Sequence, residues 1–395
     1  MPFTANIRRA RKRAAEPRSR TTPRTISNPQ LRLKGAETMR KIAKSELNSL
    51  FAAIAERAKL YVPQDTAGGA KFSEWKNGKK CSAALNTVRS AKDFFFPQTE
   101  NLMDFKLSGK TIEIIDTRSE TEDFVLFGVR ACDVKSFEIL DRVFLSDPVD
   151  TYYKNRREHG IIMSLACSRP QETCFCASFG IDAGAPEGDI VCTESEDTLY
   201  LDAKTAKGTA LMNSLNTLTE EADGEADAAE MKAVYDTVSA RIKKLPLAGL
   251  KPDAFGAGKT DEFFNAPEWK ELSSHCLGCG TCTFVCPTCQ CYDIRDFDTG
   301  HGVKRFRCWD SCMYSEFTKM SAGQPRLTQT ERFRQRFMHK LVYYPTNNNG
   351  LFSCVGCGRC LAKCPINMNI VKVMKALAKP QNRDCENGET PEGRK

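Results

Sequence analysis

The sequence predicts an α/β N-terminal region followed by a mainly helical, cysteine-rich domain. Between about residues 110 and 250, apolar runs typical of strands alternate with segments of helical periodicity. In the last third of the chain, one cysteine pattern occurs twice. A segment with strong helical character, 328–342, lies between the two copies. These three observations separate an α/β half from a cysteine-rich half.

Residues 1–38 are predicted to form a basic, disordered tail. Residues 1–41 contain twelve Lys or Arg and two Glu, so the net charge of +8 belongs to this end of the chain. Few apolar residues are present, and such a segment cannot bury a core. A basic tail can bind nucleic acid or an anionic surface. Because helical periodicity begins only at Met39, a candidate start of the chain, we expect the tail to be dispensable.

Residues 39–250 are predicted to form an α/β domain. Apolar residues recur at helical spacing over 39–60 and again over 134–144. Residues 208–245 begin acidic and continue as an amphipathic helix. The predicted strands are Thr111–Ile115, Phe124–Gly128, Ile161–Leu165 and a segment around Tyr200.

Three segments complete the predicted organisation. A Gly- and Pro-rich stretch begins at Pro246, and we predict a linker over 251–266. The cysteine-rich domain is predicted over 267–378, with a final helix from residue 370 to its end. Residues 379–395 are polar, so we predict a frayed tail in which the lone Cys385 is not a ligand.

The cysteine pattern is the most specific signal in the chain. Both copies follow C-x2-C-x2-C-x3-C-P, the run that holds [4Fe–4S] clusters in bacterial ferredoxins. Zinc ribbons use two separated cysteine pairs instead of four cysteines in one run. The spacing therefore predicts a ferredoxin-type domain with two [4Fe–4S] clusters. The cysteines of the first copy are Cys276, Cys279, Cys282 and Cys286, and those of the second are Cys354, Cys357, Cys360 and Cys364.

Each run is expected to supply its fourth cysteine to the other cluster. Three cysteines of a tight run bind one cubane, and the fourth ligates the second cubane of a two-cluster ferredoxin. The 67 residues between the copies exceed the connection of a compact ferredoxin, which favours a helical domain. We assign one cluster to Cys276, Cys279, Cys282 and Cys364, and the other to Cys354, Cys357, Cys360 and Cys286.

A further group of cysteines follows the ends of two predicted strands. Adjacent strand ends and a short loop could bring four thiols together, the number that a third [4Fe–4S] cluster requires. Free cysteines are also common as small buried hydrophobic residues. This candidate third cluster consists of Cys132, Cys167, Cys174 and Cys176.

Four cysteines between the two runs are harder to interpret. Their spacing is compatible with a fourth cluster, with a structural zinc site, or with packing around the first two clusters. These residues are Cys289, Cys291, Cys308 and Cys312. Nearby, the basic and aromatic segment 331–340 is either a docking face or a helix whose charges offset those of the clusters.

Several functional classes are disfavoured. The 19 cysteines occur without a signal peptide, so they indicate metal in a reducing cytoplasm rather than disulfides. The sequence has no apolar run long enough for a membrane span. It also has no G-x-G-x-x-G fingerprint, no P-loop and no recognisable Ser/His/Asp set. We therefore predict no catalytic residues and no substrate chemistry by this chain alone.

Several short motifs resemble one known family. They are Gly-Val-Arg-Ala-Cys132-Asp, Cys174-Phe-Cys176-Ala-Ser, Cys286-Pro-Thr-Cys289-Gln-Cys291, Trp309-Asp-Ser-Cys312 and Met338-His-Lys340. Over residues 39–378 the chain resembles a family of iron–sulfur electron-transfer proteins. That family contains the iron–sulfur component of anaerobic sulfite reductase and the sulfhydrogenase (Ni/Fe hydrogenase) beta subunit. Ser-Ala-Gly-Gln-Pro-Arg326 is closer to the hydrogenase-type members, and Cys308 is an extra cysteine relative to the family pattern.

The resemblance implies a role in electron transfer. It implies that the eight cysteines of the paired runs are cluster ligands. It also implies two partners: a flavin- and [2Fe–2S]-containing subunit that takes electrons from NAD(P)H, and a catalytic hydrogenase or sulfur/sulfite reductase subunit. The alternatives are a substrate-reducing subunit with an open cluster site and a structural metal-binding protein. Nucleic acid is not an expected partner.

Overall fold

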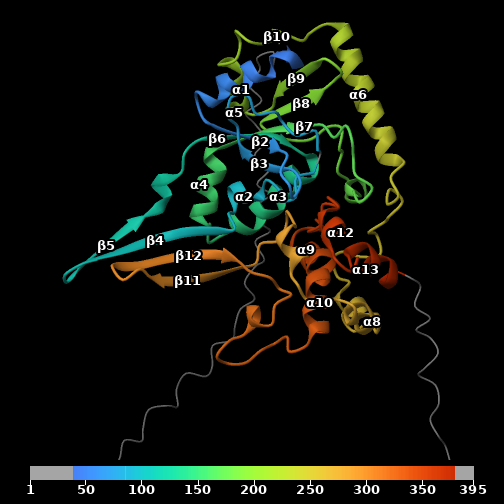
Figure 1. Cartoon of the computed structure of the whole chain (residues 1–395). Helices are drawn as coiled ribbons and strands as arrows, with labels where there is room; N and C mark the ends of the chain where they lie inside the picture. The colour runs from blue at the N-terminus through green and yellow to red at the C-terminus, as the bar shows by residue number, and fades with distance from the viewer. Residues whose placement is uncertain (1–38, 85, 379–395) are drawn as a thin grey trace, which may run out of the picture. The chain divides into compact units, whose positions relative to one another are not determined.

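The computed structural model describes residues 39–84 and 86–378. The two predicted tails, 1–38 and 379–395, lie outside these residues, and so does Cys385. Within the described part of the chain, an α/β region and a cysteine-rich region are joined by a four-stranded sheet (Figure 1).

The α/β region is built on an eight-stranded sheet. Its order is β10-β1-β9-β8-β7-β6-β2-β3. The central strands β2, β6, β7 and β8 are mutually parallel, and every other neighbouring pair is antiparallel. The strands are β1 (Arg40–Ala43), β2 (Lys59–Gln64), β3 (Lys71–Glu74), β6 (Phe124–Val129), β7 (Gly160–Leu165), β8 (Ile190–Glu194), β9 (Thr198–Ala203) and β10 (Glu220–Glu221).

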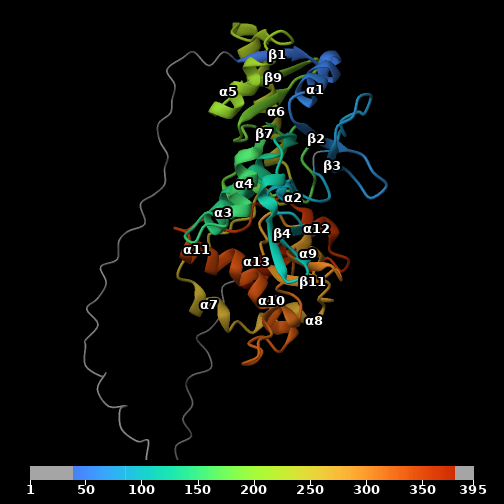
Figure 2. The same cartoon turned by 90° about the vertical axis from the view of Figure 1, so that its left-hand side faces the viewer.

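Helices cover both faces of this sheet (Figure 2). Helices α1 (Leu47–Ala55) and α5 (Ala206–Asn213) pack on one face. Helices α2 (Lys92–Phe95), α3 (Ala131–Phe144) and α4 (Thr151–His159) pack on the other. Strand β6 is buried along its whole length, as expected for a parallel strand that is covered on both faces. The long helix α6 (Glu225–Lys243) follows β10.

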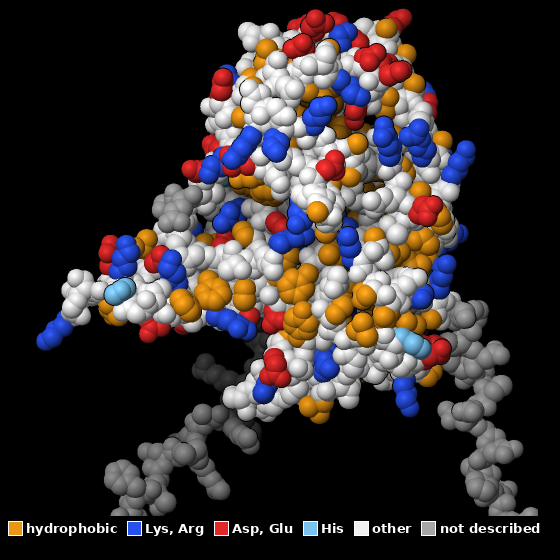
Figure 3. Space-filling model, viewed as in Figure 1, with side chains coloured by type: hydrophobic (Ala, Val, Ile, Leu, Met, Phe, Trp, Pro, Cys, Tyr) orange, Lys and Arg blue, Asp and Glu red, His pale blue; other side chains and the backbone are white. Residues whose placement is uncertain are grey.

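A second sheet unites distant parts of the chain. Its order is β11-β12-β4-β5, and β4 pairs with β12 in antiparallel register. We call these four strands the sheet arm; hydrophobic side chains gather along it (Figure 3). The two hairpins are about 180 residues apart in the sequence. Because they pair through β4 and β12, the arm connects the α/β region to the cysteine-rich region. Its strands are β4 (Thr99–Ser108), β5 (Thr111–Asp116), β11 (Tyr292–Asp298) and β12 (Gly302–Trp309).

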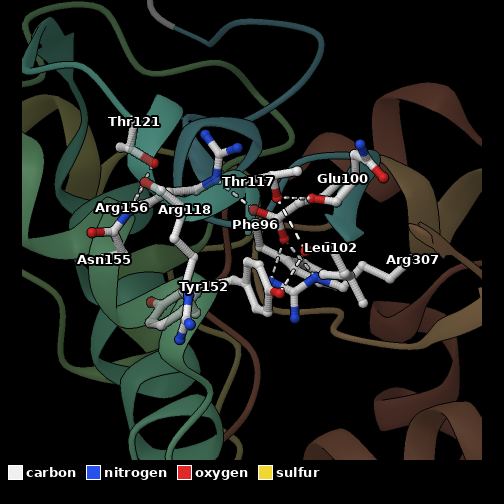
Figure 4. A network of polar contacts seen from close by, with 12 residues as sticks. Phe96, Glu100, Leu102, Thr117, Arg118, Thr121, Tyr152, Asn155, Arg156 and Arg307 are labelled. Carbon is white, nitrogen blue, oxygen red and sulfur yellow. Dashed lines mark hydrogen bonds and ion pairs between the residues drawn. The ribbon is translucent and has the colours of Figure 1, made fainter. Parts of the chain in front are cut away.

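Polar side chains fix the base of the sheet arm (Figure 4). The buried Glu100 carboxylate accepts from Arg156 Nε and from Arg307 Nε, each at 2.6 Å. The Tyr152 hydroxyl donates to Leu102 O at 2.6 Å. Since Glu100 lies on β4, Arg307 on β12 and Arg156 on α4, this network holds three elements together.

The cysteine-rich region contains a helical core. Trp269, Phe333, Phe337 and Met374 lie in its hydrophobic cluster. None of the described helices is long and apolar enough to cross a membrane. The helices are α7 (Thr260–Phe264), α8 (Glu268–Ser274), α9 (Thr281–Phe284), α10 (Gln329–Met338), the π-helical turn η5 (His339–Tyr343), α11 (Tyr344–Asn347), α12 (Arg359–Lys363) and α13 (Ile370–Leu377). Short 3-10 turns are η1 (Lys44–Glu46), η2 (Thr117–Glu120), η3 (Cys176–Phe179) and η4 (Glu316–Thr318).

The structure confirms the α/β region and the predicted strands and helices at 111–115, 124–128, 134–144, 161–165 and 328–342. The prediction of one helix over 39–60 is wrong, because α1 is flanked by strands β1 and β2. Segment 251–266, predicted as a linker, contains α7 and buries Phe255 and Phe263 in the helical core. The hairpin β11–β12 lies inside the region that was predicted to be mainly helical.

Candidate metal centre

The first cysteine run lies in the loop that leads into α9. Gly280 caps the helix with a φ of 72°, a conformation that favours glycine. The Gly278 N–H donates to Cys276 Sγ at 3.4 Å. Cys279 is exposed, and a hydrogen bond with the Thr281 side chain lowers the pKa of its thiol. This loop therefore presents one of its cysteines to solvent.

The second run repeats this local geometry before α12, in buried surroundings. Gly358, with a φ of 77°, caps α12 as its counterpart caps α9. Cys357 is buried, and burial raises the pKa of its thiol. A Cβ atom added at Gly356 would overlap the carbonyl group of Phe175. Glycine is therefore required where the α/β region presses against the cysteine loop.

Cys286, the last cysteine of the first run, lies among the thiols of the second run. Burial raises the pKa of Cys354 to about 11 and that of Cys360 to about 12, and the nearby Cys286 thiolate contributes to both rises. It also contributes, after burial, to the raised pKa of Cys357. Cys282 of the first run acts on the pKa of Cys360 as well, so the assignment of these four cysteines to one cluster stays a prediction.

The contacts of the first run do not show which cysteine completes its cluster. Burial raises the pKa of Cys282, and the thiolates of Cys312, Cys276 and Cys286 contribute to this rise. Cys364 Sγ accepts the Met368 N–H at 3.2 Å. Cys276, Cys282 and Met368 all border the same helical core. The assignment of Cys364 to this cluster stays a prediction.

Two buried cations lie among these thiols. Arg336 of α10 and Lys340 of η5 are separated by about one helical turn, and they are only 3% and 4% exposed. Burial lowers the pKa of Lys340, but the thiolates of Cys286, Cys289 and Cys354 outweigh burial, so the pKa is raised. The basic segment 331–340 therefore turns two of its charges inward, toward the cysteines.

The surroundings of Arg336 fit an iron–sulfur cluster. Its Nη2 donates to Cys282 O at 3.3 Å, but its Nε and Nη1 atoms are buried without a hydrogen-bond partner among the described residues. An unpaired buried donor costs about 1–3 kcal/mol, so such donors are usually satisfied. The thiolates of Cys282, Cys360 and Cys286 raise the pKa of Arg336 against the opposing effect of burial. Cluster sulfur bound at these cysteines would accept the free donors.

A third cation reaches the same place from the α/β region. Lys92 of α2 is buried, and its Nζ atom donates to Cys289 O at 2.9 Å. The same atom lies 3.5 Å from the centre of the Trp309 ring. Burial lowers the pKa of Lys92 to about 8. Positive charge from both regions therefore converges on the Cys286–Cys289 segment.

The candidate third cluster consists of Cys132, Cys167, Cys174 and Cys176, and all of these except Cys174 border one hydrophobic cluster. Burial raises the pKa of Cys176 to about 12, with contributions from the thiolates of Cys174 and Cys167. Burial also raises the pKa of Cys132, to which the Cys176 thiolate contributes. Cys132 begins α3, Cys167 follows β7, and the other two lie in the loop to η3. We call these residues the Cys132 group.

The Cys132 group adjoins the second run. The Phe175 N–H donates to Gly356 O at 2.8 Å. The Asn86 side chain donates to Cys357 O at 3.0 Å and lies 3.5 Å from Cys174 Sγ. These contacts place the loop of the Cys132 group directly on the loop of the second run.

A buried ion pair reinforces the same contact. Arg359, inside the second run, binds both carboxylate oxygens of Asp133, at 2.5 and 2.7 Å. Its Nε atom donates to Thr87 O at 2.8 Å. Asp133 follows Cys132 in sequence, so the ion pair ties the two thiol groups together. Sequence reasoning missed both partners, although a charged residue inside a cluster motif was a usable signal.

Of the four cysteines between the runs, three are hydrogen-bonded to another cysteine, and Cys308 has no such bond in the described part of the chain. Hydrogen bonding joins Cys291 to Cys312, which raises the pKa of Cys312. Cys289 is likewise hydrogen-bonded to Cys286, which raises the pKa of Cys289. Cys308 lies on β12, where burial raises the pKa of its thiol and the charged groups that act on it are Arg295, Asp293 and Asp310.

Among residues 39–84 and 86–378, no group of three or more His, Cys, Asp or Glu side chains is arranged to hold a metal ion. This finding concerns single ions, because each thiolate of a cubane binds a different iron atom.

Comparisons with known proteins agree with this chemistry. Residues 275–368 match a family model described as a 4Fe-4S dicluster domain. The chain is 34% identical over 291 residues to Sulfhydrogenase 2 subunit beta of Pyrococcus furiosus, which covers 73% of this chain and 82% of that protein. The chain belongs to the sulfhydrogenase beta-like iron–sulfur family. The resemblance inferred from its motifs is therefore confirmed. No solved structure matches the chain.

Proposed function

We propose that this member of the sulfhydrogenase beta-like family is an electron-relay subunit of an oxidoreductase complex. It would pass electrons between a catalytic subunit of the hydrogenase, sulfur reductase or sulfite reductase type and a flavin- and [2Fe–2S]-containing, NAD(P)H-linked subunit. The meeting of Cys286 with the thiols of the second run, around two buried cations, carries the proposal. When bound, the clusters supply one-electron transfer.

Two clusters follow from the paired runs. One would be held by Cys354, Cys357, Cys360 and Cys286, and the other by Cys276, Cys279, Cys282 and Cys364. The chain's own contribution is to exclude water from the buried set and to balance its negative charge. Arg336, Lys340 and Lys92 supply that balance from α10, η5 and α2.

The Cys132 group is proposed to hold a third [4Fe–4S] cluster. Its contacts with the second run support a linear order: the first run at the exposed end, the second run in the middle, and the Cys132 group at the carboxyl ends of β6 and β7. The α/β region of 39–250, which carries this group, would dock against the flavoprotein. Domain boundaries at 39–250, 251–266 and 267–378 remain part of this proposal.

Cys289, Cys291 and Cys312 are proposed to pack beside the clusters and not to hold a fourth one. Their hydrogen bonds run in pairs along the boundary between the two runs. The groups that shift the pKa of Cys308 are Arg295 and two aspartates and include no cysteine. A reducing cytoplasm is the setting that this many free thiols favour.

Metal analysis of the anaerobically purified chain tests the proposal. About eight iron and eight acid-labile sulfide atoms per chain indicate two clusters, and about twelve of each indicate three. EPR of the reduced protein should show interacting [4Fe–4S] centres. Zinc in place of iron would support a structural metal protein. Catalytic turnover of sulfite or polysulfide by the isolated chain would instead support the substrate-reducing alternative.

Deleting residues 1–38 tests the expectation that the tail is dispensable. Iron content and binding of the partner subunits should both stay at the level of the full chain. Loss of either one would show that the tail takes part.

A further inference from the structure

A cavity of about 320 Å³ lies at the carboxyl ends of three parallel strands. Gly128 of β6, Leu165 of β7 and Glu194 of β8 contribute to its lining. Ligands of open parallel sheets bind in the crevice beyond these strand ends. The volume is at the low end of the range for small-molecule sites, about 300–1,000 Å³. We call it the strand-end cavity, and its size favours a small ligand.

The strand-end cavity carries an excess of positive charge. Lys44, Lys80, Arg130 and Arg169 line it together with one carboxylate, Glu194. Lys44 is paired with that carboxylate, since its Nζ atom lies 2.7 Å from Oε1. In the described part of the chain, neither the Lys80 ammonium nor the Arg169 guanidinium makes an ion pair or a hydrogen bond. These two charges therefore have no protein counter-ion.

A second cavity provides a contrast. It has a volume of about 350 Å³ and lies beside the base of the sheet arm, where Arg118 and Arg156 are drawn in Figure 4. Each cation that lines it has a carboxylate partner: Lys59–Glu122, Arg118–Asp116 and Arg156–Glu100. The strand-end cavity differs from this second cavity in carrying cations without a carboxylate partner.

Arg130 gives the strand-end cavity a fixed cationic wall. The residue is 7% exposed, and its Nη1 atom donates to Ala166 O at 3.1 Å and to Leu165 O at 3.4 Å. These backbone contacts orient the guanidinium, whereas Lys80 and Arg169 are exposed and can reach toward a ligand. A planar guanidinium held in place and backed by mobile cations is suited to a group with two or more charged oxygen atoms.

We propose that the strand-end cavity binds a small oxyanion through Arg130, Lys80 and Arg169. Sulfur oxyanions, phosphate and carboxylates share the required chemistry: delocalised negative charge on at least two oxygen atoms. Arg130 lies two residues before Cys132, and Arg169 two residues after Cys167. The bound anion would therefore lie next to the Cys132 group. The proposal goes beyond the relay function and does not depend on a cluster in that group.

Calorimetric titration of the anaerobically purified full chain tests this binding. Sodium sulfite, sodium phosphate and sodium acetate are titrated separately at constant ionic strength, with sodium chloride as the reference. We expect saturable binding of one anion per chain for at least one of the three oxyanions, and none for chloride. The arm that saturates at the lowest concentration identifies the class of anion.

Three substitutions assign the binding to the strand-end cavity. Lys80→Gln and Arg169→Gln each remove an exposed charge and should weaken binding by about tenfold. Ala83→Glu places a carboxylate on the lining and should abolish binding. As the control, Lys232→Gln removes an exposed lysine on α6 that does not line the strand-end cavity, and it should change nothing.

Failure of anion binding can be distinguished from failure of the proposed electron-relay function. Iron content is measured on every titrated sample, so that loss of clusters is separated from loss of anion binding. Unchanged iron with no saturable heat overturns the proposal. So does binding that is equal in wild type, Lys80→Gln, Arg169→Gln and Ala83→Glu, or binding of chloride as strong as that of the oxyanions.

Discussion

The two cysteine runs share one sequence pattern but have opposite surroundings. In the first run, Leu277 is 65% exposed and Cys279 is also exposed. At the corresponding positions of the second run, Val355 is 2% exposed and Cys357 8% exposed. Both loops use left-handed glycines before a short helix, so their local backbones are alike. The difference comes from what packs on them.

This contrast separates two tasks of the chain. The run itself determines which thiols can reach a cluster, whereas distant segments determine solvent access and charge. Arg359 of the second run binds the buried Asp133, whereas the hydroxyl of the corresponding residue of the first run, Thr281, accepts a hydrogen bond from Cys279 Sγ in its own loop. Burial and hydrogen bonding set the potential of a cluster. The two proposed clusters should therefore differ in potential, and the exposed one should exchange electrons with a partner.

The largest expected effect comes from the crossing cysteines. Cys286→Ser should remove the same EPR signal as Cys357→Ser, because both are assigned to the buried cluster. Cys364→Ser should remove the other signal. Each substitution should lower the iron content by about four atoms per chain.

Cys308→Ser is the matched control for these substitutions. Its thiol lies on β12 opposite Asp293 and outside both cysteine runs, so iron content and EPR should be unchanged. If Cys286→Ser removed the signal that Cys276→Ser removes, each run would hold its own cluster and the crossed assignment would be wrong.

The buried ion pair between Arg359 and Asp133 provides the second test of the difference between the two runs. Arg359→Met leaves the carboxylate of Asp133 buried without its partner, which costs about 3–5 kcal/mol. Thr281→Ala, at the corresponding position of the first run, should cost less than about 1 kcal/mol. The midpoint of thermal unfolding, measured anaerobically at one scan rate, compares the two.

A double substitution sharpens this test. Arg359→Met combined with Asp133→Leu removes both charges and should recover part of the lost stability. Equal destabilisation by the single and double substitutions would show that the ion pair contributes little and that packing alone joins the Cys132 group to the second run.

A smaller effect is expected from the glycine that lies against Phe175. Gly356 and Gly109 have nearly equal φ angles, 58° and 59°. A Cβ atom at Gly356 would overlap the Phe175 carbonyl, whereas at Gly109 nothing lies within 4 Å. Gly356→Ala should therefore destabilise the protein by about 1–3 kcal/mol more than Gly109→Ala. Equal shifts of the unfolding midpoint would mean that backbone strain, and not the close approach, explains the glycine.

The pattern of the runs made the cysteines predictable, but their surroundings were not. The spacing of Cys276–Cys286 and Cys354–Cys364 is local, and it alone predicts the chemistry of the ligands. The strands Phe124–Val129 and Gly160–Leu165 were also predictable, because buried parallel strands are continuous apolar runs. Each of these signals lies within a few neighbouring residues.

Features that depend on distant pairing escaped prediction. Strand β11 has four charged residues among its seven, so the apolar pattern of the hairpin β11–β12 is weak, and its stability comes from pairing with β4. No sequence pattern around Lys92 predicts that it is a buried cation, since α2 is only four residues long. Asp133 is paired with a residue 226 positions away. Such contacts become visible only when the two regions are folded against each other.

The last prediction concerns charge beside the buried run. Arg336→Gln removes a buried cation next to the thiolates of Cys282, Cys360 and Cys286. A reduced cluster carries one more negative charge than an oxidised one, so losing the cation should make reduction harder. At an effective dielectric constant of about 20, which suits buried sites as well, charges about 6–15 Å apart interact by roughly 1–3 kcal/mol, which corresponds to about 40–130 mV for one electron. Redox titration followed by EPR measures the shift toward more negative potential.

Arg334→Gln is the control on the same helix. Arg334 is two residues away and turned toward Phe264, with its guanidinium carbon 3.7 Å from the centre of that ring. Its removal changes the net charge of the chain by the same amount, so a general charge effect would shift the potential equally in both variants. A shift confined to Arg336→Gln would show that the inward-facing charge tunes the cluster. Equal shifts would assign the effect to net charge and leave the buried guanidinium with a packing role.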